Sequence, residues 1–353
     1  MSRRPAALAA LLALLGGTSG CAAARLAWSP GDLRAEIARR SPATEPADVI
    51  VPFELGDADR ARAVEIAGGL RSIDAKVKAL VAAMFDPEQL GLRYASRVTG
   101  DAATTLRARE GNCLALASVF VGLARAIGLE AYYIDASARV HETTHGDDGM
   151  TVSAGHVTAM VVTPRGNVGL DFSRIGPFAW YRTLDDVEAA AHFYNNRAYE
   201  RIEGARARGA PVDWSAAALD FRRAADVKPA FAGAWSNLGM AHAALGREDD
   251  AVRAYEEAIR RGPRLVAPRN NLGVLLLRRG DVASARAVLE GAAALPSSGP
   301  HVLYNLALAR LRAGDREGAI AALRAARTRG YARAQRLLDD LALARSGGPG
   351  APQ

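Results

Sequence analysis

The sequence is poor in cysteine and lysine, and its most apolar stretch, near the start of the chain, is too short to cross a bilayer. Cysteine occurs only at Cys21 and Cys113, so no more than one disulfide can form within the chain. Lysine occurs only at Lys76, Lys78 and Lys228, and the formal net charge of +7 comes from arginines spread along the chain. Without runs of basic residues, the charge does not indicate a nucleic acid partner.

The first 21 residues have the pattern of an export signal. Arg3 and Arg4 precede about ten apolar residues, and small residues follow up to Cys21. The ending "TSGC" resembles the lipobox of bacterial lipoproteins. This resemblance implies a signal peptide at 1–21, acylation of Cys21 and, because Ala22 follows, a periplasmic protein anchored by lipid in the outer membrane. An ordinary secreted protein is the alternative. Acylation of Cys21 would leave Cys113 as a free thiol.

The C-terminal half repeats itself with a period of 34 residues. Asparagine recurs at Asn237, Asn271 and Asn305, and glycine and alanine recur at fixed places in "NLGMAHAALGREDDAVRAYEEAI" and its two successors. The period and the small residues resemble the tetratricopeptide repeat. The resemblance implies stacked helix pairs with a concave surface for a peptide or protein, which the three asparagines could contact. The alternative is that these asparagines satisfy backbone groups within the array.

The segment "GNCLALASVFVGLARAIG" is apolar on almost every side and predicts a buried helix that begins at Cys113. Asn112 is a good N-cap and Gly128 a good stop. At the first helical position, the helix dipole favours a thiolate, so we expect a lowered thiol pKa. Three segments of strand length follow, with His156 opening the second and Asp171 near the end of the third.

A cysteine on a buried helix, followed by strands with a histidine and an aspartate, resembles the core of the transglutaminase-like superfamily, which is related to papain-type proteases. The resemblance covers about residues 74–172. It implies that Cys113 is the nucleophile, His156 the base and Asp171 the carboxylate that orients the imidazole. The Cys113 backbone N–H would stabilise the oxyanion, with the neighbouring Asn112 at the site, and Tyr94 is our candidate for the second donor.

A metal site is the competing interpretation of the histidines. His141, His145, Asp147 and Asp148 lie close in sequence to His156, but glycines between them argue against a helix that would align them. We therefore expect an exposed polar loop beside the active site, no metal and no cofactor.

These patterns predict an α+β papain-like or transglutaminase-like core followed by an all-α repeat solenoid. We expect a signal peptide at 1–21, a tether and N-terminal extension at 22–56, the core at 57–185, about four repeats with a capping helix at 186–345, and a disordered tail at 346–353. The predicted function is acyl transfer on peptide or protein amides in the cell envelope, with water or an amine as acceptor. The alternative is an inactive core that, with the repeats, binds proteins as an assembly factor.

Overall fold

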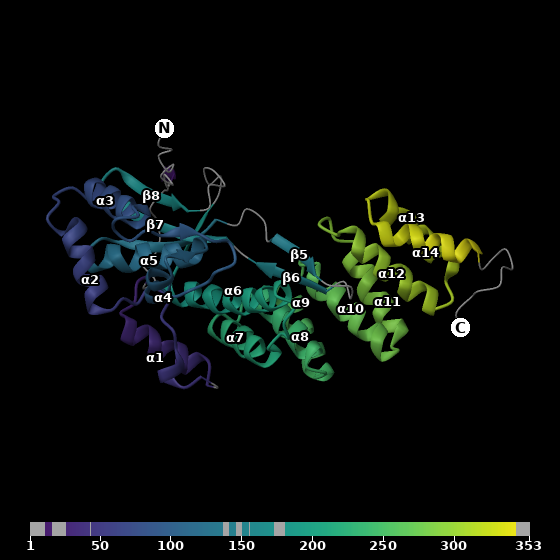
Figure 1. Ribbon diagram of the computed structural model, residues 1–353. Helices are drawn as coiled ribbons and strands as arrows, with labels where there is room; N and C mark the ends of the chain where they lie inside the picture. The colour runs from purple at the N-terminus through teal and green to yellow at the C-terminus, as the bar shows by residue number, and fades with distance from the viewer. Residues whose placement is uncertain are drawn as a thin grey trace. The chain divides into compact units, whose positions relative to one another are not determined.

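The computed structural model describes residues 11–15, 26–42, 44–136, 141–145, 150–154, 156–172 and 181–343 (Figure 1). The chain forms two compact units, one from the segments 1–141 and 154–229 and the other from the segments 142–153 and 230–353. The first unit contains the sheet, and the second contains the regular helix pairs. The predicted order, an α+β core followed by a helical array, is confirmed.

A five-stranded antiparallel sheet forms the centre of the first unit, with the strand order β1-β8-β7-β4-β9. Apolar residues dominate β7, and six of its seven residues are buried. The three strands predicted from the sequence are β4, β7 and β8. The strands are β1 (Leu11–Leu15), β4 (Ala131–Asp135), β7 (Val157–Thr163), β8 (Gly166–Asp171) and β9 (Arg182–Leu184).

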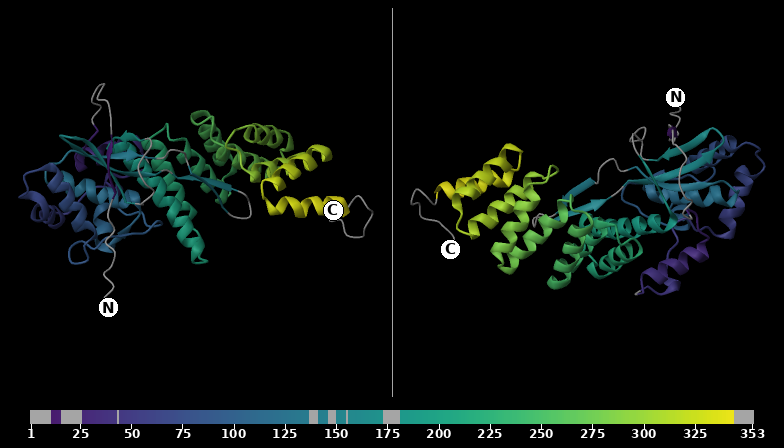
Figure 2. Two further views of the ribbon diagram at one scale, coloured as in Figure 1. Left: turned by 90° about the horizontal axis from the view of Figure 1, so that it is seen from above. Right: turned by 180° about the vertical axis from the view of Figure 1, so that it is seen from behind.

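Helix α5 (Cys113–Ala126) packs against β7 and β4, and Figure 2 shows the sheet from the side opposite to that of Figure 1. Every residue from Cys113 to Ala124 is buried, as the apolar pattern predicts. Gly122 is required because a Cβ there would lie 2.5 Å from the Phe53 carbonyl oxygen. The helix ends as predicted at Gly128, which has a φ of +76°. Helix α5 is therefore held in place on several sides.

Shorter elements surround α5 and lead the chain to it. Parallel pairing of β2 with β3 places Tyr94 opposite Gly111, two residues before Cys113. The elements are α2 (Asp57–Ala63), a π-helical turn (Val64–Gly68), α3 (Ile73–Phe85), β2 (Arg93–Tyr94), α4 (Ala102–Ala108) and β3 (Glu110–Gly111).

Part of the segment expected to be a tether, 22–56, is folded onto the first unit. Helix α1 (Pro30–Arg40) starts at the N-cap Ser29 and buries Leu33 and Ile37 completely. A 3-10 turn (Pro46–Asp48) follows. The Arg40 side chain donates a hydrogen bond to the Val227 carbonyl oxygen at 3.0 Å. The prediction of a tether is therefore wrong from Pro30 onward, because apolar residues spaced four apart give this charged segment a buried face.

Helices α6 (Asp186–Ala207) and α7 (Trp214–Val227) pack against each other and belong to the first compact unit. Helix α6 contacts β4 and β9. Arg197 of α6 forms a bidentate ion pair with the buried Asp220 of α7, at 2.8 and 2.5 Å. The division by contacts therefore ends the first unit with α7, and the boundary at 185/186 stays a prediction.

The second unit contains three regular helix pairs and a final helix, visible in succession in Figure 1. Gly246, Gly280 and Gly314 lie between the helices of each pair with φ of +72°, +82° and +80°, which explains why glycine recurs there. The helices are α8 (Ala232–Ala244), α9 (Glu248–Arg261), α10 (Ala267–Arg279), α11 (Val282–Ala293), α12 (Pro300–Arg312), α13 (Arg316–Thr328) and α14 (Ala332–Leu343). A separate two-stranded sheet is formed by β5 (His141–His145) and β6 (Met150–Ala154).

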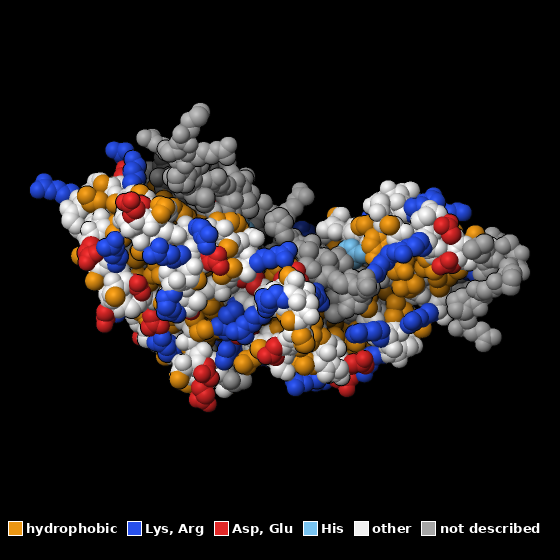
Figure 3. Space-filling model, viewed as in Figure 1, with side chains coloured by type: hydrophobic (Ala, Val, Ile, Leu, Met, Phe, Trp, Pro, Cys, Tyr) orange, Lys and Arg blue, Asp and Glu red, His pale blue; other side chains and the backbone are white. Residues whose placement is uncertain are grey.

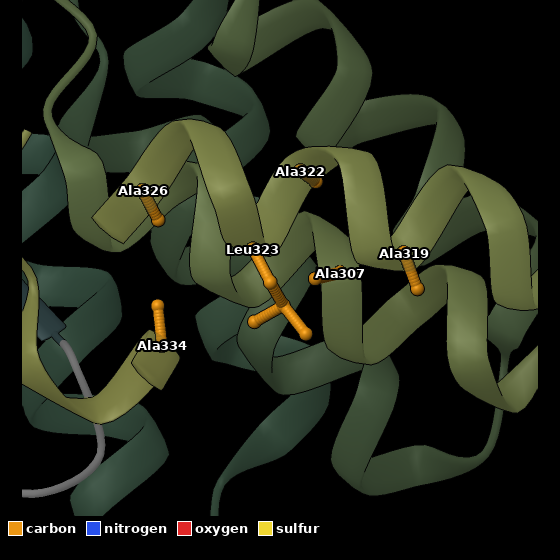
Figure 4. Packing of buried hydrophobic residues seen from close by; sticks show 6 residues of the cluster. All are labelled: Ala307, Ala319, Ala322, Leu323, Ala326 and Ala334. Atoms are coloured by element: carbon orange, nitrogen blue, oxygen red, sulfur yellow. The ribbon is translucent and has the colours of Figure 1, made fainter. Parts of the chain in front are cut away.

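The recurrent small residues lie where helices of the array approach closely. Figure 4 shows Ala307, Ala319 and Ala326 with Leu323 in the last pair, and all four side chains are fully buried. In an earlier pair, a Cβ on Gly273 would lie 2.4 Å from Leu289 Cγ. The period of the sequence is therefore the period of the helix contacts.

Overpacking one of these contacts should destabilise the array. We expect Ala285→Trp to lower the free energy of unfolding by about 1–3 kcal/mol, because Ala285 is fully buried beside Leu289 and Leu306. Urea unfolding followed by circular dichroism would measure the change. Arg286→Trp is the matched control at the exposed next position and should have a much smaller effect. Equal effects of the two substitutions would contradict the assigned contact.

On the face shown in Figure 3, lysine and arginine side chains are interspersed with aspartate and glutamate. This pattern matches the scattered basic residues of the sequence. In the described part of the chain, no helix is both long enough and apolar enough to cross a membrane.

Candidate active site

The start of α5 is built around Asn112. Its Oδ1 accepts a hydrogen bond from the Ala115 backbone N–H at 2.9 Å, which confirms the predicted N-cap. Its own backbone N–H donates to the Val98 carbonyl oxygen at 2.8 Å. Cys113 therefore occupies the first helical position, where the backbone N–H groups of the first turn point out of the helix.

The Cys113 thiol is buried beside the start of β7. Burial, with smaller contributions from the negative charges of Glu200 and Asp171, raises its pKa to about 12. The backbone N–H groups of Leu114 and Val157 donate hydrogen bonds to the sulfur and act in the opposite direction. The thiol is therefore protonated at neutral pH. The predicted lowering of its pKa is wrong for this arrangement, because lost hydration outweighs the helix dipole.

His156 immediately precedes β7 and Asp171 ends the neighbouring strand β8, at the end of the sheet that faces the thiol. His156 immediately precedes Val157, whose N–H contacts the sulfur. Its Nε2 lies 4.0 Å from Asp171 Oδ1, and the two side chains are 11% and 2% exposed. This distance exceeds that of a hydrogen bond. The fold thus brings together the three residues predicted from the sequence, in a looser arrangement than a fully formed triad.

Tyr94 lies at the same site and is more exposed than the other three side chains. Its pKa is raised to about 12, chiefly by burial and to a smaller extent by the negative charges that Cys113, Asp171 and Glu200 carry when ionised. Its hydroxyl therefore stays protonated at neutral pH and can donate a hydrogen bond. Tyr94 is 36% exposed, whereas Cys113 is 9% exposed.

Glu200, on α6, is a member of the site that the sequence analysis missed. Its Oε1 accepts from Asn112 Nδ2 at 2.6 Å, and Thr99 Oγ1 accepts from the same nitrogen at 2.7 Å. Both N–H groups of the Asn112 side chain are thus engaged within the protein, and its place at an oxyanion stays a prediction. Burial raises the pKa of Glu200 to about 7, against hydrogen bonds from Thr99 and Asn112 that lower it.

The three repeated asparagines of the array are buried. Asn237, Asn271 and Asn305 are 0%, 1% and 6% exposed. Asn305 Nδ2 donates to Asn270 Oδ1 at 2.8 Å, which links two neighbouring helix pairs. These positions favour the alternative that the asparagines bond within the array, and contact with a bound peptide remains a prediction.

The remaining candidates are only partly within the described structure. Cys21, Asp147 and Asp148 lie outside the described residues. His141 and His145 are on β5, which replaces the expected loop with a strand. Among the described residues, no group of three or more histidines, cysteines, aspartates or glutamates is placed to hold a metal ion.

Solved structures similar to this chain include MamA, with 20% identity over 41% of this chain and 84% of that one, at a TM-score of 0.36. A thermophilic TPR protein of Thermus thermophilus has 20% identity over 42% of this chain and 91% of that one, at a TM-score of 0.35. The Cut9-Hcn1 hetero-tetramer of APC/C has 23% identity over 38% of this chain and 24% of that one, at a TM-score of 0.33. No curated protein matches the chain.

Two family profiles match separate parts of the sequence. The transglutaminase-like superfamily matches residues 60–172. The tetratricopeptide repeat matches residues 202–266, 248–300 and 270–332. The chain therefore consists of a transglutaminase-like domain followed by tetratricopeptide repeats.

Proposed function

We propose that the protein is a thiol enzyme of the cell envelope that transfers acyl groups from peptide or protein amides. The observation that carries the proposal is the placement of the Cys113 sulfur against the Val157 N–H, next to His156, with Asp171 beside the imidazole. A nucleophile, a base and an orienting carboxylate from three different elements are the parts that such a reaction needs.

The reaction begins with a neutral thiol. His156 takes the proton from Cys113 as the sulfur attacks the amide carbonyl carbon, and the imidazolium then protonates the leaving nitrogen. The Cys113 backbone N–H and the Tyr94 hydroxyl stabilise the oxyanion of the tetrahedral intermediate. The result is a thioester on Cys113 and a free amine. Water then gives a carboxylic acid, whereas a second amine gives a new amide.

The repeats recruit the protein substrate or a partner, because stacked helix pairs provide an extended surface for a peptide or protein. Lipid on Cys21 would hold the enzyme at the periplasmic side of the outer membrane, and cleavage before Cys21 would remove β1 and leave β8, β7, β4 and β9 in the sheet. The first 21 residues support this placement through their basic start, short apolar run and final cysteine.

The second candidate function is an inactive, protein-binding assembly factor. The specific observation in its favour is the protonated, buried thiol, which differs from the ion pair of a thiolate with an imidazolium. In that case the same fold would serve only as a scaffold for the repeats.

Incubation with dimethylcasein and dansylcadaverine would test the proposal. Amine transfer would attach the fluorophore to casein, amide hydrolysis would release ammonia without labelling, and peptide hydrolysis would create new amino termini. Cys113→Ala should abolish each product while leaving the circular dichroism spectrum unchanged, since the substitution removes only the sulfur. If the unmodified protein forms no more product than Cys113→Ala in any of the three assays, the result favours the assembly factor.

A further inference from the structure

Glu200 lies where α6 meets the start of the cysteine helix. One carboxylate oxygen accepts a hydrogen bond from the Asn112 side chain, and the other accepts one from the Thr99 backbone N–H. Asn112 caps α5, and Thr99 belongs to the loop that precedes α4. A single carboxylate therefore holds both the first turn of the cysteine helix and the loop beside it.

The charge of Glu200 also acts on the reactive end of the site. When ionised, it disfavours loss of a proton from Cys113 and from Tyr94. Asp171 of β8 also acts on Tyr94, and His156, which precedes β7, lies beside Asp171. Around Tyr199, the neighbour of Glu200 on α6, the charged groups are Arg97, Glu203 and Arg206. Of these, Asp171 adds to the effect of Glu200 on the thiol.

We propose that Glu200 is a positioning residue of the Cys113 site, which fixes the start of the cysteine helix and, when ionised, places a negative charge near the thiol. It lies outside the matched segment 60–172, so the transglutaminase-like domain of this protein uses a residue that the superfamily profile does not reach. The consequence for turnover rests on the proposed acyl transfer, whereas the effect on the thiol does not.

The pKa of Glu200, about 7, sets the pH range in which this charge is present. Below pH 6 the carboxyl group is largely protonated, and above pH 8 it is largely ionised. The thiol loses its proton at still higher pH, so the charge opposes thiolate formation throughout the titration of Cys113. Removal of the charge should therefore increase thiol reactivity only above pH 7.

Alkylation of Cys113 by iodoacetamide in the full chain would test the proposal, with the modified peptide measured by mass spectrometry between pH 5 and 9. We expect Glu200→Gln to alkylate about three- to tenfold faster than the unmodified protein at pH 8–9 and at a nearly equal rate at pH 5, because glutamine keeps the size of the side chain and one of its two accepting oxygens but removes the charge. Glu203→Gln, one turn further along α6, is the matched control and should leave the rate unchanged.

A rate increase of the same size at every pH would come from the lost hydrogen bond and not from the lost charge, and it would overturn the electrostatic part of the proposal, as would an unchanged rate. If Cys113 is too buried to react in either protein, the pH dependence of the free energy of unfolding tests the proposal instead. Because the folded-state pKa of Glu200 is raised above its ordinary value of 4.5, the unfolded chain loses this proton first, and stability should fall as pH rises from about 4.5 to about 7. Glu200→Gln should lose that slope, and retention of the slope would refute the proposed environment. Failure of the casein assays alone would leave this result standing.

Discussion

His156→Ala is expected to reduce the rate of acyl transfer by about 10³- to 10⁴-fold at pH 7. The reason is the pKa of Cys113, about 12, at which only roughly one thiol in 10⁵ is ionised at neutral pH. The base must therefore remove the proton during attack, whereas a site with a preformed thiolate would depend on it less. The ratio of kcat/KM for the two proteins, measured with a substrate found in the casein assays, gives the effect.

The matched control is His301→Gln, which changes a half-buried histidine of the repeat unit. We expect it to leave kcat/KM within about twofold, since His301 has no place in the proposed chemistry. A loss of less than tenfold in His156→Ala would show that Cys113 ionises without this base, and the proposed role of His156 would then be wrong.

Asp186→Ala is expected to lower the free energy of unfolding by about 3–5 kcal/mol. The Asp186 side chain is fully buried and accepts bidentate hydrogen bonds from Arg125 at 2.7 and 2.9 Å and one from the Trp28 backbone N–H at 2.8 Å. Its removal leaves the Arg125 guanidinium, whose side chain is 17% exposed, without its carboxylate at the end of α5. Urea unfolding of the full chain would measure the loss.

Two further variants separate the ion pair from the helix end. Asp185→Ala removes only the N-cap of α6 and should cost about 1 kcal/mol. The double variant Arg125→Met/Asp186→Leu removes both charges and should recover much of the stability lost in Asp186→Ala. If the double variant is as unstable as Asp186→Ala, the cost does not come from an unpaired buried charge.

The parts of the fold that follow from local patterns could be predicted from the sequence. The apolar run after Asn112 predicted a buried helix with the correct cap, and the period of 34 residues predicted the helix pairs of the array. Both signals arise because each residue's role depends on neighbours within a few turns. The placement of Cys113, His156 and Asp171 could also be expected, since each lies at or next to the end of a helix or strand that the apolar pattern predicts.

The missed features depend on contacts between distant parts of the sequence. Glu200 bonds to a residue 88 positions away and Asp186 to one 61 positions away, and in the sequence each resembles an ordinary acidic residue of a helix. The predicted direction of the Cys113 pKa shift was wrong for a related reason. The helix dipole is a local property, whereas the desolvation that outweighs it comes from the packing of the whole unit around the thiol.

The position of α6 limits where segments of this protein can be joined to segments of another protein in a chimera. The matched segments end at 172 and begin again at 202, and a chimera designed from them would place its junction in the interval between. That interval contains Asp186 and Glu200, whose partners Arg125 and Asn112 lie within the first segment. The two halves therefore cannot be exchanged independently of each other at this junction. An exchange that keeps these contacts should be made after Val227, where α7 ends.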